Sequence, residues 1–146
     1  MKKISKDREK DVLITLKSIQ SSYSEKEETE LITEGRLRKV DGGFQIMYDE
    51  TEATGFLGST TVLSCFGNSR ASMERIGTAP STLIIEKNKK HHCHYGTPYG
   101  ELMVGVYTHM IDNSLTENGG KLYFKYTLDV NSSYVSDNEV YINVKA

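Results

Sequence analysis

The residues best suited to chemistry gather in one stretch of the chain, His91–Met110. This stretch contains all four histidines and one of the two cysteines. Imidazole nitrogens and thiolates are common zinc ligands, and a thiol beside a basic group can act as a nucleophile. A metal centre and a nucleophilic site are therefore the first two hypotheses for this stretch.

The turn inside this stretch determines which way the histidines face. Thr97–Gly100 fits a type I turn followed by a glycine bulge, because a two-residue type I′ turn would need a positive φ that its proline cannot adopt. This register sets His92 opposite Val106 and His94 opposite Val104. Both valines belong to an alternating apolar face, so His92 and His94 are predicted to point inward. A shift of one residue would reverse the prediction.

The histidine pair lacks the partners that either kind of site requires. A zinc site needs at least a third ligand, and His109 and Cys93 are both expected on the opposite face of the hairpin from His92 and His94. A reactive thiol needs a base within reach, which the spacing gives to neither Cys93 nor Cys65. We therefore predict no metal site, no catalytic residue and no cofactor.

Most of the chain alternates between apolar and polar residues with a period of two, the pattern of a β-strand with one buried face. The clearest case is residues 121–129, where Leu122, Phe124, Tyr126 and Leu128 share one face. Turn signals separate roughly ten such runs, and no helical periodicity lasts longer than a turn or two. The sequence therefore predicts an all-β protein.

The short connections between these runs favour a closed barrel over a sandwich, because sandwiches need some long crossovers. We predict a single antiparallel up-and-down β-barrel of about eight to ten strands, whose interior can hold one small ligand. Thr, Tyr, Arg and His side chains among the apolar positions would make that interior partly polar. The candidate ligand-binding residues are Tyr48, Arg75, His92, His94, Thr108 and Tyr126.

Composition limits the class of protein and its partners. The 146 residues fit one domain, residues 1–146, with a charged N-terminal arm at residues 1–10. The net charge of −2 supplies no basic field for nucleic acid or an anionic membrane, and no apolar run is long enough for a membrane span. Two cysteines are too few for a disulfide-built secreted module, so we expect reduced thiols and a cytoplasmic protein.

A succession of short motifs runs through nearly the whole chain after the N-terminal arm. The motifs are Glu34–Leu37, Met47–Glu50, Thr54-Gly55, Thr60-Thr61, Met73–Arg75, Tyr95–Gly100, Thr108, Gly120–Leu122 and Tyr126. Together they resemble the YwiB-like family of bacterial proteins of unknown function, and the turn at residues 97–100 is the most specific of them. The resemblance implies a lipocalin-like (calycin) barrel and assigns no catalytic or ligand-binding residue. The histidines at positions 91, 92 and 94 do not belong to the family pattern.

The first functional hypothesis is a noncatalytic binder of a small, mostly apolar ligand held in the barrel, with no nucleic acid and no membrane as partner. One alternative is a small enzyme with Tyr, His or Glu groups at the barrel mouth. Its charged candidates are Glu50, Glu52 and Glu101 with Arg75, although no spacing places them together. Another is a protein-interaction module that uses an exposed strand or the loop at residues 51–59, which could otherwise cover the mouth as a lid. Association into a homo-oligomer is left open.

Overall fold

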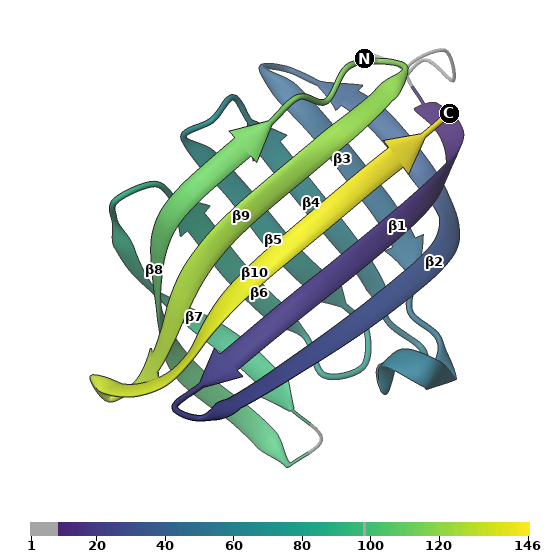
Figure 1. Ribbon diagram of the computed structural model, residues 1–146. Helices are drawn as coiled ribbons and strands as arrows, with labels where there is room; N and C mark the ends of the chain where they lie inside the picture. The colour runs from purple at the N-terminus through teal and green to yellow at the C-terminus, as the bar shows by residue number, and fades with distance from the viewer. Residues whose placement is uncertain (1–8, 98) are drawn as a thin grey trace, which may run out of the picture.

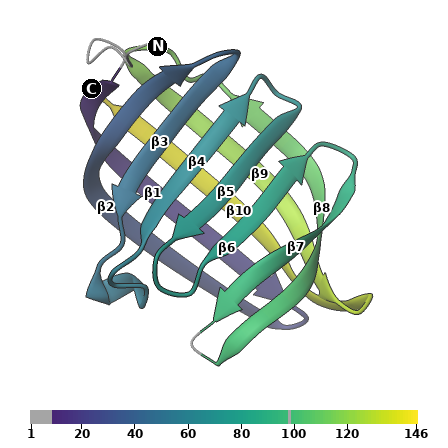
Figure 2. The same cartoon turned by 180° about the vertical axis from the view of Figure 1, so that it is seen from behind.

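The computed structural model describes residues 9–97 and 99–146, which form ten β-strands and one short 3-10 helix. The strands close into one antiparallel barrel in which neighbours in sequence are neighbours in space and β1 pairs with β10 (Figures 1 and 2). The prediction of an all-β, up-and-down barrel is confirmed. The elements are β1 (Glu9–Ser22), β2 (Glu25–Val40), β3 (Gly43–Asp49), η2 (Glu52–Thr54), β4 (Thr60–Phe66), β5 (Arg70–Ile76), β6 (Ser81–Glu86), β7 (Lys90–Thr97), β8 (Gly100–Asn113), β9 (Gly119–Val130) and β10 (Ser133–Lys145).

The first and last strands lie side by side. Their ladder runs from Leu13 opposite Lys145 to Ser21 opposite Asp137. The predicted N-terminal arm falls mostly on residues 1–8, which lie outside the described residues, and its last two residues already belong to β1. Within the described part of the chain, no helix combines the length and the apolar composition that a membrane crossing needs.

The interior of the barrel differs between its two ends. At the packed end, where the chain turns from β2 to β3, β4 to β5, β6 to β7 and β8 to β9, the inward positions carry large apolar side chains. Ile14, Phe124 and Ile142 are among them, and all three are buried. At the mouth end, which lies lower in Figure 1, inward positions of the same strands are polar, as at Ser18 in β1 and Asn138 in β10. The polar end of the interior is where a site can form.

The ladder between β6 and β7 is much shorter than the others. Every residue of β1 pairs with a residue of β2, whereas Ser81 opposite Tyr95 is the only ladder pair between β6 and β7 in the described chain. Figure 2 shows β6 and β7 side by side on the near wall of the barrel. We call this interface the seam.

Side chains also bridge the seam, both beside its ladder pair and along the rest of its length. One contact lies at the mouth end, one near the middle and one toward the packed end. At the mouth end, Arg75 Nη2 donates to Ser81 Oγ at 2.5 Å and to the Gly96 carbonyl oxygen at 2.9 Å. Near the middle, the Ile84 amide donates to Cys93 Sγ at 3.4 Å. Toward the packed end, His91 Nε2 is hydrogen-bonded to Glu86 Oε1 at 2.8 Å. The barrel is therefore closed at this point largely by side chains.

The β7–β8 hairpin has a different register from the predicted one. Thr97 pairs with Gly100 and Cys93 pairs with Val104, so two residues connect the strands and the predicted glycine bulge is wrong; residue 98 itself lies outside the described residues. The observed register buries the Cys93 side chain at 3% exposure. Burying a thiol costs less than burying imidazoles without partners, so the interior overrides the turn preference.

Candidate functional site

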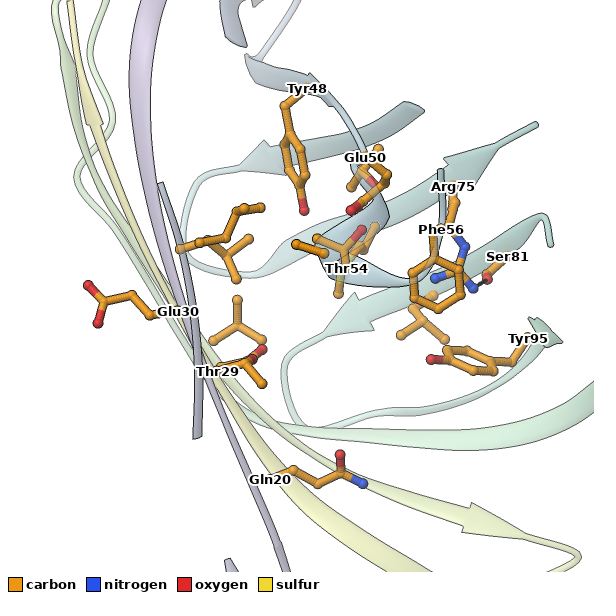
Figure 3. A pocket seen from close by; sticks show the side chains of 18 of the residues that line it. Gln20, Thr29, Glu30, Tyr48, Glu50, Thr54, Phe56, Arg75, Ser81 and Tyr95 are labelled. Carbon is orange, nitrogen blue, oxygen red and sulfur yellow. Dashed lines mark hydrogen bonds between the residues drawn. The ribbon is translucent and has the colours of Figure 1, made fainter. Parts of the chain in front are cut away.

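A cavity of about 390 Å³ lies inside the mouth end of the barrel (Figure 3). Every strand except β8 contributes to its walls, together with the segment that joins β3 to β4. Its apolar lining includes Leu16, Leu31, Phe56, Met73, Leu83 and Val140. Its polar lining includes Tyr48, Glu50, Thr61, Arg75, Ser81, Tyr95 and Tyr126.

Arg75 of β5 is held in the cavity wall by three hydrogen bonds. Its Nε donates to the carbonyl oxygen of Ala79 at 2.8 Å, and its Nη2 donates to Ser81 Oγ at 2.5 Å and to the carbonyl oxygen of Gly96 at 2.9 Å. The guanidinium carbon lies 3.6 Å from the centroid of the Phe56 ring, a cation–π contact. These contacts fix a positive charge in one orientation beside the cavity.

Glu50 brings a negative charge to the same cavity. Thr61 Oγ1 donates to Glu50 Oε1 at 2.6 Å. Burial, followed by the nearby Glu50 charge, raises the pKa of the Tyr48 phenol well above its usual range. Tyr48 therefore stays protonated at neutral pH and serves as a hydrogen-bond donor.

Tyr126 of β9 adds a second phenol with the same property. Burial raises the pKa of Tyr126 far above its ordinary value, and the neighbouring Tyr95 phenol adds to the effect. Figure 3 shows the Tyr95 ring at the edge of the cavity, on the same side as Arg75. The cavity thus offers neutral donors, one guanidinium and one carboxylate, and no His or Cys is among its lining residues in the described chain.

The segment between β3 and β4 covers part of the mouth. The η2 helix ends at Gly55, whose φ of 84° lies in the left-handed region that glycine adopts easily. Phe56 then turns into the cavity (Figure 3), whereas Leu57 is 63% exposed to solvent. If residues 51–59 act as a lid over the mouth, Phe56 is in a position to cover the cavity, whereas Leu57 is not.

His92 and His94 lie on the outer face of β7, so the prediction that they point inward is wrong. The observed register pairs His92 with Gly105 and His94 with Met103, one residue away from the predicted pairs. Both histidines are exposed, and His94 Nδ1 is hydrogen-bonded to the carboxylate of Glu101. Neither residue lines the cavity.

Thr108 is the third predicted residue that the structure places away from the cavity. Its side chain is fully buried at 0% exposure, and its Oγ1 has no hydrogen-bond partner in the described chain. Its carbonyl oxygen accepts a backbone hydrogen bond from the β6–β7 turn at 2.9 Å. Of the six predicted ligand-binding residues, Tyr48, Arg75 and Tyr126 line the cavity.

Groups that could hold a metal or attack a substrate are dispersed. Among residues 9–97 and 99–146, no three His, Cys, Asp or Glu side chains come close enough together to bind a metal ion. Cys65 and Cys93 are free, buried thiols. Burial raises the pKa of Cys65 to about 11 and also raises that of Cys93, which favours the unreactive neutral form.

Several cavity-lining residues are absent from the predicted set, above all Thr61, Ser81 and Tyr95. A signal for two of them is present in the sequence. Once strands alternate in direction, the inward positions of β4 and β6 turn from apolar to polar toward the same end of the barrel, ending at Thr61 and Ser81. Tyr95 has no such signal, because its position depends on the register of β7.

The fold and the cavity define the class of protein as a closed, ten-stranded antiparallel β-barrel with one hollow end. The chain belongs to the family described as Domain of unknown function (DUF1934), whose model matches residues 14–142. It is similar to the crystal structure of the ywiB protein from Bacillus subtilis, with a TM-score of 0.83 and 18% sequence identity over 95% of this chain and 93% of that chain. At this identity the likeness shows the fold alone. None of the curated proteins compared with the chain matches it. The predicted YwiB-like family is confirmed.

Proposed function

We propose that the protein binds a small, mostly apolar ligand in the cavity at the mouth end and catalyses no reaction on it. The observation that carries the proposal is the cavity itself, about 390 Å³ of space inside a barrel whose other end is packed. Small-molecule sites usually measure roughly 300–1,000 Å³. The cavity lies at the small end of this range, so the ligand is a compact molecule.

The lining of the cavity supports the same proposal. Leu16, Leu31, Met73 and Leu83 form apolar walls, and a few polar groups converge on the space between them. Such a lining is typical of small-molecule sites, in which the apolar walls contribute affinity and the polar groups fix orientation. Barrels of the lipocalin type hold one small ligand in their interior, and we propose a corresponding use of the barrel here.

The alternative of an enzyme has less support. The two cavity tyrosines with perturbed pKa values, Tyr48 and Tyr126, are shifted in the direction that keeps them protonated, which suits binding and not proton abstraction. Glu50 and Arg75 share the cavity, but Glu52 and Glu101 do not line it. The interaction-module and homo-oligomer alternatives stay predictions. A cytoplasmic location is part of the proposal and is supported by the two free thiols.

Octan-1-ol is a suitable probe for the proposal because it is neutral, mostly apolar and small. We expect its titration into ¹⁵N-labelled protein to shift, saturably, the amide resonances of residues around the cavity, such as Leu31 and Met73. Residues of the packed end, such as Cys65 beside the β4–β5 turn, should not respond. The measurement is a series of ¹H–¹⁵N correlation spectra.

A pair of matched substitutions localises the binding. Met73→Trp places a larger side chain in the cavity and should abolish the shifts. Met103→Trp makes the same change on the outer face of β8, where Met103 is 48% exposed, and should leave them intact. The proposal is wrong if neither octan-1-ol nor octanoate, its acid counterpart, shifts a cavity resonance. It is also wrong if Met73→Trp binds the alcohol as well as the unaltered protein does.

A further inference from the structure

Arg75 carries a positive charge for which the described chain provides no carboxylate partner. Among residues 9–97 and 99–146, eight ion pairs join acidic and basic side chains, the two histidine pairs included, and Arg75 takes part in none of them. Its guanidinium is nevertheless partly buried, with the Phe56 ring centroid 3.6 Å and the Tyr95 ring centroid 5.4 Å from its central carbon. A partly buried charge is costly unless an opposite charge or several hydrogen bonds compensate it.

The hydrogen bonds of Arg75 leave two of its donors unused. A guanidinium has five N–H donors. The bonds to Ala79, Ser81 and Gly96 use the single N–H of Nε and both of Nη2. No acceptor for the two N–H groups of Nη1 is found among the described residues. Nε and Nη2 thus fix the side chain in place, and the N–H groups of Nη1 are free to donate hydrogen bonds to a ligand.

Arg75 is itself one of the residues that line the cavity. Figure 3 shows the guanidinium beside the open space, with Phe56, Ser81 and Tyr95 around it. Met73 precedes Arg75 by two residues on the same inward face of β5, and Leu83 of β6 also lines the space. A molecule that reaches Nη1 therefore has its remaining atoms against apolar side chains.

Glu50 limits the charge of that molecule. Its carboxylate lines the same cavity and is held by Thr61 at 2.6 Å. A second negative group on the ligand would meet this carboxylate in a space with only one guanidinium. Glu30 also borders the cavity, but Figure 3 shows its carboxylate directed away from the space. The electrostatics therefore favour one acidic group on the ligand.

We infer that the ligand is a monocarboxylic acid with a compact apolar body, whose carboxylate accepts hydrogen bonds from Arg75 Nη1. This inference rests on the proposed function and specifies its ligand class. Phe56 and Tyr95 shield the pair from water, and the apolar body lies against Met73 and Leu83. Charge-assisted hydrogen bonds from a fixed guanidinium are among the stronger polar contacts in proteins, so the acid is preferred over its neutral counterpart.

Octanoate and octan-1-ol test the inference because they share a chain of eight carbons and differ at the head group. By isothermal titration calorimetry at neutral pH, we expect octanoate to bind the unaltered protein roughly tenfold or more tightly than octan-1-ol. Arg75→Gln should remove this preference, so that the two probes bind the variant with similar affinities. Arg70→Gln, on the same strand but at the packed end and exposed, should leave both affinities unchanged.

The outcomes separate this inference from the proposed function. Equal affinities for the two probes in the unaltered protein, or an octanoate preference that survives Arg75→Gln, would overturn the inference while the proposed function stands. Failure of both probes to bind would overturn the proposed function and the inference with it. The comparison of the two probes on the unaltered protein needs no variant, so the test holds even if Arg75→Gln does not fold.

Discussion

The packed end and the mouth end of the barrel are built from the same strands but bury their side chains differently. At the packed end, Ile14, Phe124 and Ile142 fill the interior, each with no more than 2% exposure. At the mouth end, Ser136 and Asn138 are also buried, but Asn138 Nδ2 donates to Ser136 Oγ at 3.0 Å. One end is stabilised by apolar packing, whereas the other uses polar contacts around an open space.

The difference lies in residue type and not in the pattern of alternation. Along β1 the inward positions run from Val12 through Ile14 and Leu16 to Ser18 and Gln20. Polar side chains need water or hydrogen-bond partners, so they cannot pack into a dry core. A few polar positions at the same end of several strands are enough to leave a cavity, while the other end of the same sheet keeps the fold stable.

The largest expected effect is a difference in stability between two variants, each of which truncates one phenylalanine at one end of the barrel. Phe124→Ala should lower the free energy of unfolding by about 3–5 kcal/mol, because it empties a fully packed site. Phe56→Ala should cost about 1 kcal/mol or less, since Phe56 borders an existing cavity and loses mainly its contact with Arg75. Urea denaturation measures both. Similar losses for the two variants would mean that the ends do not differ in packing.

A smaller effect is expected from two arginines on β5. Arg75→Gln should cost about 1–2 kcal/mol, because three hydrogen bonds that join the β5–β6 turn, β6 and β7 are lost. Arg70→Gln removes an exposed guanidinium that lies 4.8 Å from the Phe66 ring, and should cost about 0.5 kcal/mol. Thermal and urea unfolding measure both losses. If Arg70→Gln proved the more costly change, Arg75 would not contribute to closing the seam.

The smallest expected effect is a difference in the rates at which the two buried thiols react. Cys65 lies in the packed core, where burial raises its pKa to about 11, and Cys93 lies in the seam. Both should react slowly with a disulfide reagent at pH 8, because the thiolate is the reactive form. Cys93 should react first, since local opening of the seam exposes it without global unfolding.

Variants that keep only one cysteine show which reaction rate belongs to which thiol. Cys65→Ala leaves only Cys93 to react, and Cys93→Ala leaves only Cys65. In denaturant both thiols should react at once. Equal slow rates for the two variants in native buffer would show that the seam opens no more readily than the packed end.

The strands, the closed barrel and part of the site can be predicted from the sequence because they depend on local alternation. Tyr48, Arg75 and Tyr126 were identified in this way, since each lies on a strand whose inward face is clear. The register of β7 cannot be obtained locally. Both of its faces carry polar residues, so only the burial of Cys93 and Tyr95 inside the assembled barrel selects between them.

The loop residue Phe56 shows a second limit of sequence reasoning. Phe56 and Leu57 are adjacent and similarly apolar, yet one lines the cavity and the other faces solvent. Their orientations depend on the left-handed backbone at Gly55 and on the position of Arg75 on another strand. Local composition cannot distinguish between them.

The short ladder at the seam also bears on the order in which the chain supplies its strands to the sheet. Apart from the single pair of Ser81 with Tyr95, the backbone ladders of the described residues run unbroken from β7 through β10 and β1 to β6, so that β1 and β10 lie in the middle of the series. A circular permutant that joins the natural ends and begins at β7 would follow this series in order. The pairing of Leu13 with Lys145, which now spans almost the whole chain, would become a hairpin contact. Relative contact order would fall, and with it the entropic cost of bringing distant strands together during folding.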